Sequence, residues 1–79
     1  MLLIGCAQAT ILAEKLHQHE IKGVLFKVIK QNGLSLTVEH NADDDRTAKA
    51  LVKEFVGSLP EIRNFYVNVQ MIDESGRIL

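Results

Sequence analysis

The chain contains few of the residues that mark particular classes of protein. Its 79 residues include one cysteine, one proline, one tyrosine and no tryptophan. A single cysteine cannot form an internal disulfide, which fits a reducing compartment, and we expect a cytoplasmic protein. The formal net charge of −1 argues against an electrostatic binder of nucleic acid or membrane surfaces, because such proteins usually carry a basic excess.

Long hydrophobic runs are also absent. The apolar start of the chain ends at Gln8, has no basic residues before it and therefore does not fit a signal peptide. No stretch approaches the ~20 apolar residues of a membrane span, so we expect no membrane association. The length predicts a single domain over residues 1–79. A domain of this size buries roughly 60% of its unfolded surface, which makes association with a partner a natural supplement.

The strongest positive signal is a hairpin. Two alternating runs, Val24 to Lys30 and Leu34 to His40, meet at Gln31-Asn32-Gly33. An Asn-Gly pair between such runs is the best short-range indication of a β-hairpin. Alternation assigns one apolar face to the hairpin, and we expect its side chains to point inward: Val24, Phe26, Val28, Leu34, Leu36 and Val38.

Two helices are expected on either side of this hairpin. From about Gln8 to Glu20 the apolar residues follow helical spacing, and Gly23 marks the turn into the hairpin. After the hairpin, Asn41 or Asp43 can cap a second helix that ends near Gly57. Its predicted buried stripe has i, i+3, i+4, i+7 spacing: Ala48, Leu51, Val52 and Phe55.

Two further strands complete the predicted fold. Met1 to Cys6 is apolar on both alternating faces, which is typical of a buried strand, and Phe65 to Ile72 alternates with Phe65 inward. The resulting β-α-β-β-α-β order predicts an α+β two-layer sandwich. It would be ferredoxin-like, with two helices on one face of a four-stranded antiparallel sheet. If residues 1–6 are helical, an α-β-β-α-β fold results instead.

Few residues suggest chemistry. Cys6 is a candidate thiol for a redox protein or enzyme, since it lies where a strand would lead into a helix. A buried small hydrophobe is the more common role of a free cysteine. His17 and His19 would point to different sides of a helix, and His40 ends a strand, so we expect no metal site. We expect no cofactor and no enzymatic activity.

The segment from the second hairpin strand into the second helix resembles the second half of ACT regulatory domains. The residues that carry this likeness are Leu34-Ser35-Leu36-Thr37-Val38, Asp45, Ala48, Ala50-Leu51 and Glu54-Phe55. ACT domains are ferredoxin-like modules that bind amino acids and pair through their sheets. The resemblance implies a small-molecule ligand at Gly5-Cys6-Ala7-Gln8, although the family's aspartate-x-proline-glycine turn is absent there.

The same region also resembles DinI-like proteins, which are small modulators of the recombinase RecA. The matching residues are Asn32 to Leu36, Asp45, Leu51 and Glu54-Phe55. This resemblance implies a modulator of a DNA-repair protein. The family's last helix is strongly acidic, whereas this one carries Arg46, Lys49 and Lys53 among its acids.

The outward side chains of the sheet suggest a protein interface. Leu25 and Ile29 flank Lys27 on the side away from the helices, and Tyr66 could join them. The strand Val24 to Lys30 would lie at a sheet edge, and exposed apolar sheet surface with an open edge favours pairing. We therefore expect a non-enzymatic interaction or regulatory module that binds a protein partner or itself, most simply as a homodimer.

Overall fold

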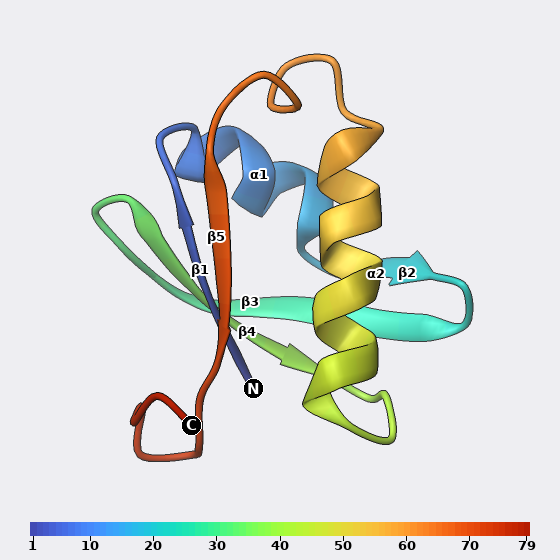
Figure 1. The fold of residues 1–79 in the computed structure, drawn as a ribbon, viewed down its shortest axis with the longest axis vertical. Helices are drawn as coiled ribbons and strands as arrows, with labels where there is room; N and C mark the ends of the chain where they lie inside the picture. The colour runs from blue at the N-terminus through green and yellow to red at the C-terminus, as the bar shows by residue number, and fades with distance from the viewer.

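The computed structural model describes residues 1–79 and has two helices beside one antiparallel sheet (Figure 1). The sheet has five strands in the order β2-β3-β4-β1-β5, and every pairing is antiparallel. The elements are β1 (Leu2–Cys6), α1 (Ala9–Leu16), β2 (His19–Ile21), β3 (Val24–Asn32), β4 (Ser35–His40), α2 (Asp45–Gly57) and β5 (Val67–Met71). The α+β class is confirmed, and residues 2–6 form a strand rather than a helix.

The prediction of four strands is wrong, because the expected first helix ends early. It stops at Leu16, and the residues that follow form β2, which pairs with the start of β3. Between them Lys22 and Gly23 both have positive φ, at 49° and 85°. Positive φ at both central residues defines the tight type I′ turn that matches strand twist, so a short hairpin replaces the last helical turn. β3 is therefore not an edge strand where β2 covers it.

The second hairpin forms where predicted, but its turn lies one residue later. Asn32 pairs with Ser35, so the central residues are Gly33 and Leu34 rather than Asn32 and Gly33. Only Gly33 has positive φ, at 61°, which fits a type II′ turn with glycine at its first central position. Leu34, expected inward, lies in this turn and is 62% exposed.

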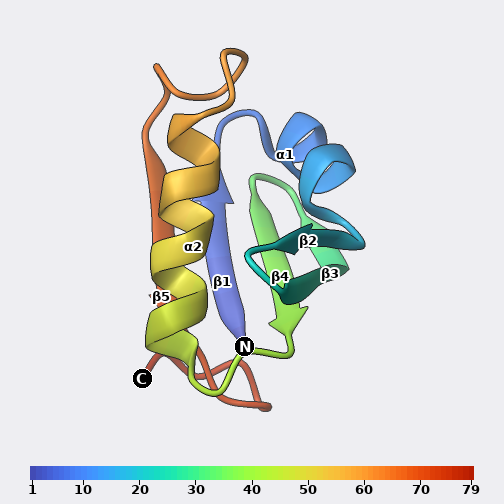
Figure 2. The same ribbon diagram turned by 90° about the vertical axis from the view of Figure 1, so that its right-hand side faces the viewer.

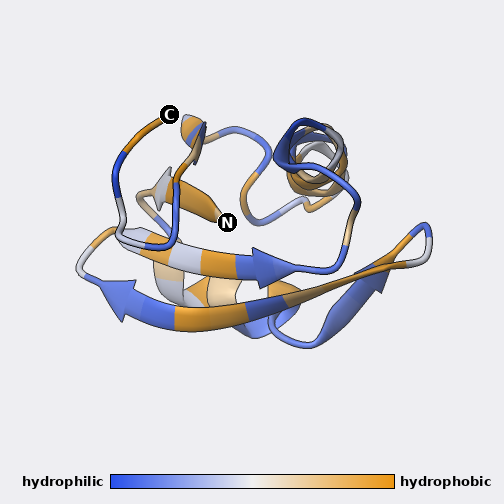
Figure 3. Cartoon of the chain, turned by 90° about the horizontal axis from the view of Figure 1, so that it is seen from below, coloured by the Kyte–Doolittle hydropathy of each residue, from blue (hydrophilic) through white to orange (hydrophobic).

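A β-bulge interrupts the pairing of β3 with β4. Val28 pairs with Val38 and Lys30 with Thr37, so Ile29 has no residue opposite it. The extra residue shifts the alternation, and Gln31 thereby falls on the same side of the sheet as Leu36. There the Gln31 side-chain amide donates to Thr10 Oγ1 of α1 at 3.0 Å. Figure 3, coloured by hydropathy, shows polar and apolar bands alternating along β3, the longest strand.

The core lies between the two helices and one face of the sheet. Alternate residues of β1 pair with apolar residues on both sides, as Ile4 does with Leu36 and Val69. Figure 2 shows α2 beside β1 and β5, with α1 beside the part of the sheet that contains β3 and β4. The buried cluster comprises Leu2, Ile4, Cys6, Ala9, Leu12, Leu16, Phe26, Leu36, Val38, Ala48, Val52, Val56, Ile62 and Val69.

Helix α2 follows its sequence signals with small differences. Asp44, not Asn41 or Asp43, is the N-cap, and its carboxylate accepts from Thr47 N at 2.7 Å. Gly57 is the last helical residue, and Ser58 follows as the C-cap. The prediction that Phe65 points inward from a strand is wrong, because β5 begins at Val67 and Phe65 is 45% exposed. Neither helix combines the length and apolar character that a membrane span requires.

Candidate functional site: the uncovered face of the sheet

The sheet face opposite the helices has no element packed over it. Its side chains alternate with those of the core, so Leu3 stands between Thr37 of β4 and Gln70 of β5. Leu3, Thr37 and Gln70 are half-buried by their neighbours. We call this face the open face, because its side chains are free to meet another molecule.

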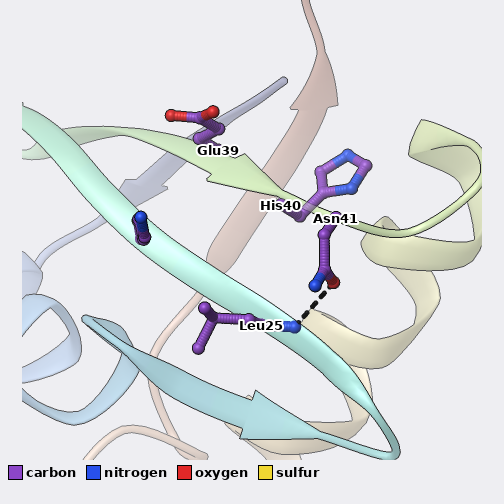
Figure 4. A pocket seen from close by; sticks show the side chains of 5 residues that line it. Leu25, Glu39, His40 and Asn41 are labelled. Carbon is purple, nitrogen blue, oxygen red and sulfur yellow. Dashed lines mark hydrogen bonds between the residues drawn. The ribbon is translucent and has the colours of Figure 1, made fainter.

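A hollow of about 240 Å³ lies at one end of the open face, where β3 and β4 run side by side (Figure 4). It is lined by Leu25, Lys27, Glu39, His40 and Asn41. The Asn41 side chain accepts from the main-chain N–H of Leu25 at 2.8 Å, as the dashed line in Figure 4 marks. This bond ties the end of β4 to the start of β3 and fixes one wall of the hollow.

Two oppositely charged side chains in this hollow lie opposite each other on neighbouring strands but form no salt bridge. Lys27 and Glu39 are register partners on β3 and β4, and both side chains are exposed. The ion pairs of the chain involve other residues: Met1 with Asp45, Lys15 with Glu61, and Lys22 with Glu54. The ammonium of Lys27 and the carboxylate of Glu39 are therefore both free to meet groups of a partner.

The four predicted interface residues lie in different parts of the open side of the molecule. Leu25 and Lys27 line the hollow just described. Ile29 is 51% exposed at the bulge and lines no hollow. Tyr66 is 83% exposed and lines a second, wider hollow at the far end of β4. The structure thus brings together two of the four residues.

The second hollow measures about 410 Å³ and includes the loop that leads from β1 to α1. Its lining consists of Gly5, Cys6, Ala7, Leu34, Ser35, Tyr66 and Asn68. No charged side chain is among these residues, and the polar groups are a hydroxyl, an amide and a phenol. A small neutral or zwitterionic molecule would meet the Ser35 hydroxyl, the Asn68 amide and the Tyr66 phenol there, together with main-chain groups.

Cys6 and the histidines have structural surroundings. The Cys6 side chain belongs to the core, is 3% exposed, and its Sγ accepts from Gln8 N at 3.3 Å. His17 Nδ1 accepts from Val28 N at 3.1 Å, and the His19 ring packs on Phe55 with centroids 4.9 Å apart. No three histidine, cysteine or acidic side chains come close enough together to hold a metal ion.

His40 belongs to a polar cluster that links distant parts of the chain. Ala42 N donates to its Nδ1 at 3.1 Å, which leaves Nε2 as the donor to Asp45 Oδ1 at 2.6 Å. The same oxygen accepts from the Met1 ammonium at 2.9 Å. Hydrogen bonds from that ammonium and from His40 hold the pKa of Asp45 below its ordinary value. The cluster joins Met1, the end of β4 and the start of α2; the position of His40 beside the acidic run indicated its part in the cluster, whereas the part of Met1 had no sequence signal.

Comparison with family models, characterised proteins and solved structures finds no match to this chain.

Proposed function

We propose that this chain is a non-enzymatic interaction module that self-associates through the open face of its sheet. The observation that carries the proposal is the unpaired Lys27–Glu39 couple beside Leu25. In a two-fold symmetric dimer each surface patch meets its own copy, so residue i contacts j and j contacts i. A neighbouring lysine and glutamate are self-complementary under that symmetry, because each can pair with the opposite charge of the second copy.

The apolar side chains around this couple support the same proposal. Leu25 and Leu3 are half-buried on the open face, and Ile29 is half exposed at the bulge next to it. An apolar centre with a polar rim is the usual composition of a protein interface. The Lys27 and Glu39 charges would then set the register of the two copies, while the leucines contribute burial.

Sedimentation velocity over a wide concentration range tests this proposal. We expect a monomer–dimer equilibrium that the single substitution Lys27→Glu shifts strongly toward monomer, since two glutamates would then face each other at each of two sites. Arg46→Glu serves as the control, because Arg46 is an exposed cation on α2, away from the open face, and takes part in no ion pair. A wild-type chain that stays monomeric at the highest concentration contradicts the proposal.

We also propose that the fold is ferredoxin-like with one added strand. The four long strands have the order β3-β4-β1-β5, and a helix follows the first and the third of them along the chain. That order and those connections support the four-stranded arrangement of this fold, with β2 added beside β3. A regulatory role in the cytoplasm would suit a small self-associating module of this kind.

A second candidate function is the sensing of a small ligand at the hollow beside Tyr66. The wide hollow at the β1–α1 loop favours it, because this is where the likeness to ACT domains implies a ligand. A ligand that binds only the native state raises the unfolding temperature. A panel of the common amino acids in thermal-shift measurements should therefore give a shift that Ser35→Val or Tyr66→Ala removes. No shift across the panel would eliminate this function.

A further inference from the structure

The outer edge of β5 carries main-chain groups without a partner strand. β5 is the last strand of the sheet, and Ile72 N donates to Met1 O toward β1 at 3.0 Å. Since successive residues of a strand direct their N–H and C=O groups to opposite sides, those of Val67, Val69 and Met71 face away from β1. An unpaired edge of this kind is a template for an added strand.

One end of this edge already accepts an extended segment of the chain itself. Leu79 N donates to Met71 O at 2.9 Å, and Asp73 N donates to Arg77 O at 3.0 Å. These two bonds form the antiparallel bridge between Ile72 and Ile78. The edge next to Val69 and Val67 continues from there without a strand beside it, so it has the geometry for pairing and lacks only the segment.

A hollow of about 240 Å³ runs between α2 and this edge, and it is basic. Lys53, Val56 and Gly57 line it from α2, and Arg63, Phe65 and Val67 line it from the chain entering β5. Neither Lys53 nor Arg63 takes part in any ion pair of the chain. Val67 and Phe65 supply an apolar wall, and Phe65 is 45% exposed.

We propose that the edge of β5 binds an extended acidic segment of a partner protein, which adds to the sheet as a sixth strand. Alternate side chains of an added strand point to the same side of the sheet as Val67, and therefore toward this hollow. Acidic side chains there meet Lys53 and Arg63 while their apolar stems lie on Val67. A second copy of β5 fits less well, because Val67-Asn68-Val69-Gln70-Met71 has no carboxylate to neutralise the two cations.

This site is separate from the open face and does not depend on self-association there. The self-association site uses Leu25, Lys27 and Glu39 on β3 and β4, whereas the edge site uses main-chain groups of β5 and side chains of α2 and of the segment that enters β5. A chain with both surfaces would be an adaptor that pairs with itself and holds an acidic segment of another protein. Each surface can be tested without disturbing the other.

The probe is a fluorescent, terminally blocked octapeptide of alternating valine and glutamate, compared with its valine–lysine counterpart. Fluorescence anisotropy should show binding of the glutamate peptide alone, weakened by added salt. Amide hydrogen exchange of Val67 and Val69 should slow when this peptide is bound. Equal binding of both peptides, no binding of the glutamate peptide, or protection confined to β3 and β4 would each overturn the proposal.

Two variants sharpen the test without breaking a native contact. Lys53→Glu combined with Arg63→Glu should weaken the glutamate peptide by about tenfold or more and make the lysine peptide the better ligand. Gly57→Leu should place a side chain in the hollow that Gly57 lines. The fold should tolerate it, because a Cβ on Gly57 meets no atom within 4 Å and leucine favours a helix over glycine. Lys30→Glu, on β3, should leave binding unchanged. Unaltered binding of the glutamate peptide by the Lys53→Glu, Arg63→Glu double variant or by Gly57→Leu would overturn the proposal.

Discussion

The two faces of the sheet are made from the same strands but meet different surroundings. β1 contributes to both, because Leu2, Ile4 and Cys6 are buried under the helices while Leu3 and Gly5 stand on the open face. On the covered face apolar residues are explained by packing against α1 and α2. On the open face no element of the chain explains Leu3 and Leu25, and the neighbouring Lys27 and Glu39 are unpaired. The difference separates the residues that stabilise the fold from those available for a partner.

The largest expected effect is the difference in stability between a substitution on the covered face and one on the open face. Ile4 is fully buried, and Ile4→Ala should lower the free energy of unfolding by about 2–5 kcal/mol, through lost transfer energy and the cavity left behind. Leu3→Ala, one residue away on the open face, should cost less, about 1–2 kcal/mol, because Leu3 is only partly buried and leaves no closed cavity. Urea denaturation of both variants measures the two values. Equal losses would mean that the open face is also packed within the monomer.

The sequence predicted the covered face well, because burial there follows simple periodicity. The continuous apolar run of Met1 to Cys6 located β1, alternation in Leu34 to His40 located β4, and the acidic run before Arg46 located the start of α2. No comparable signal marks β2, since His19 to Ile21 is only three residues long and largely polar. The local pattern that does indicate the β2–β3 hairpin is Lys22-Gly23 between the β-branched residues Ile21 and Val24.

The open face and the edge site could be predicted only in part, because tertiary pairing determines them. Leu25 and Lys27 were identified from alternation, but their neighbour Glu39 depends on the strand register. The bulge at Ile29 leaves no mark in an alternating sequence without glycine. Lys53 and Arg63 line the same hollow beside β5 because the chain between α2 and β5 folds back. No local sequence pattern indicates this turn of the chain.

A smaller loss of stability is expected at the polar cluster of Met1, His40 and Asp45. Asp45→Asn keeps the acceptor for Met1 and His40 but removes the charge, and should cost about 1 kcal/mol at neutral pH. Asp43→Asn is the matched control, since Asp43 has no hydrogen bond or ion pair in the structure. Chemical denaturation at pH 7 measures both. A loss as large for Asp43→Asn would assign the effect to the general charge of this segment instead.

Acid should weaken the fold through the same carboxylate and three others. Hydrogen bonds from Thr47 to Asp44, from Met1 to Asp45, from Lys15 to Glu61 and from Ser75 to Asp73 lower the pKa of each carboxyl group. A folded-state pKa below the unfolded one contributes stability above the unfolded pKa, and this contribution is lost as pH falls through the folded pKa. Stability should therefore decline below about pH 4, with a smaller decline in Asp45→Asn. A decline that begins near neutral pH would contradict this assignment.

The most direct test of the central claim mixes two variants of opposite charge. Lys27→Glu alone and Glu39→Lys alone should each sediment as monomers, because like charges would face each other across the two-fold axis. Mixed in equal amounts, they should form a heterodimer in which both pairs are attractive again. Each variant still carries its own like-charge couple within the chain, so recovery can come only from the second copy. A mixture that stays monomeric, or single variants that associate as well as the wild type, would contradict self-association through the open face.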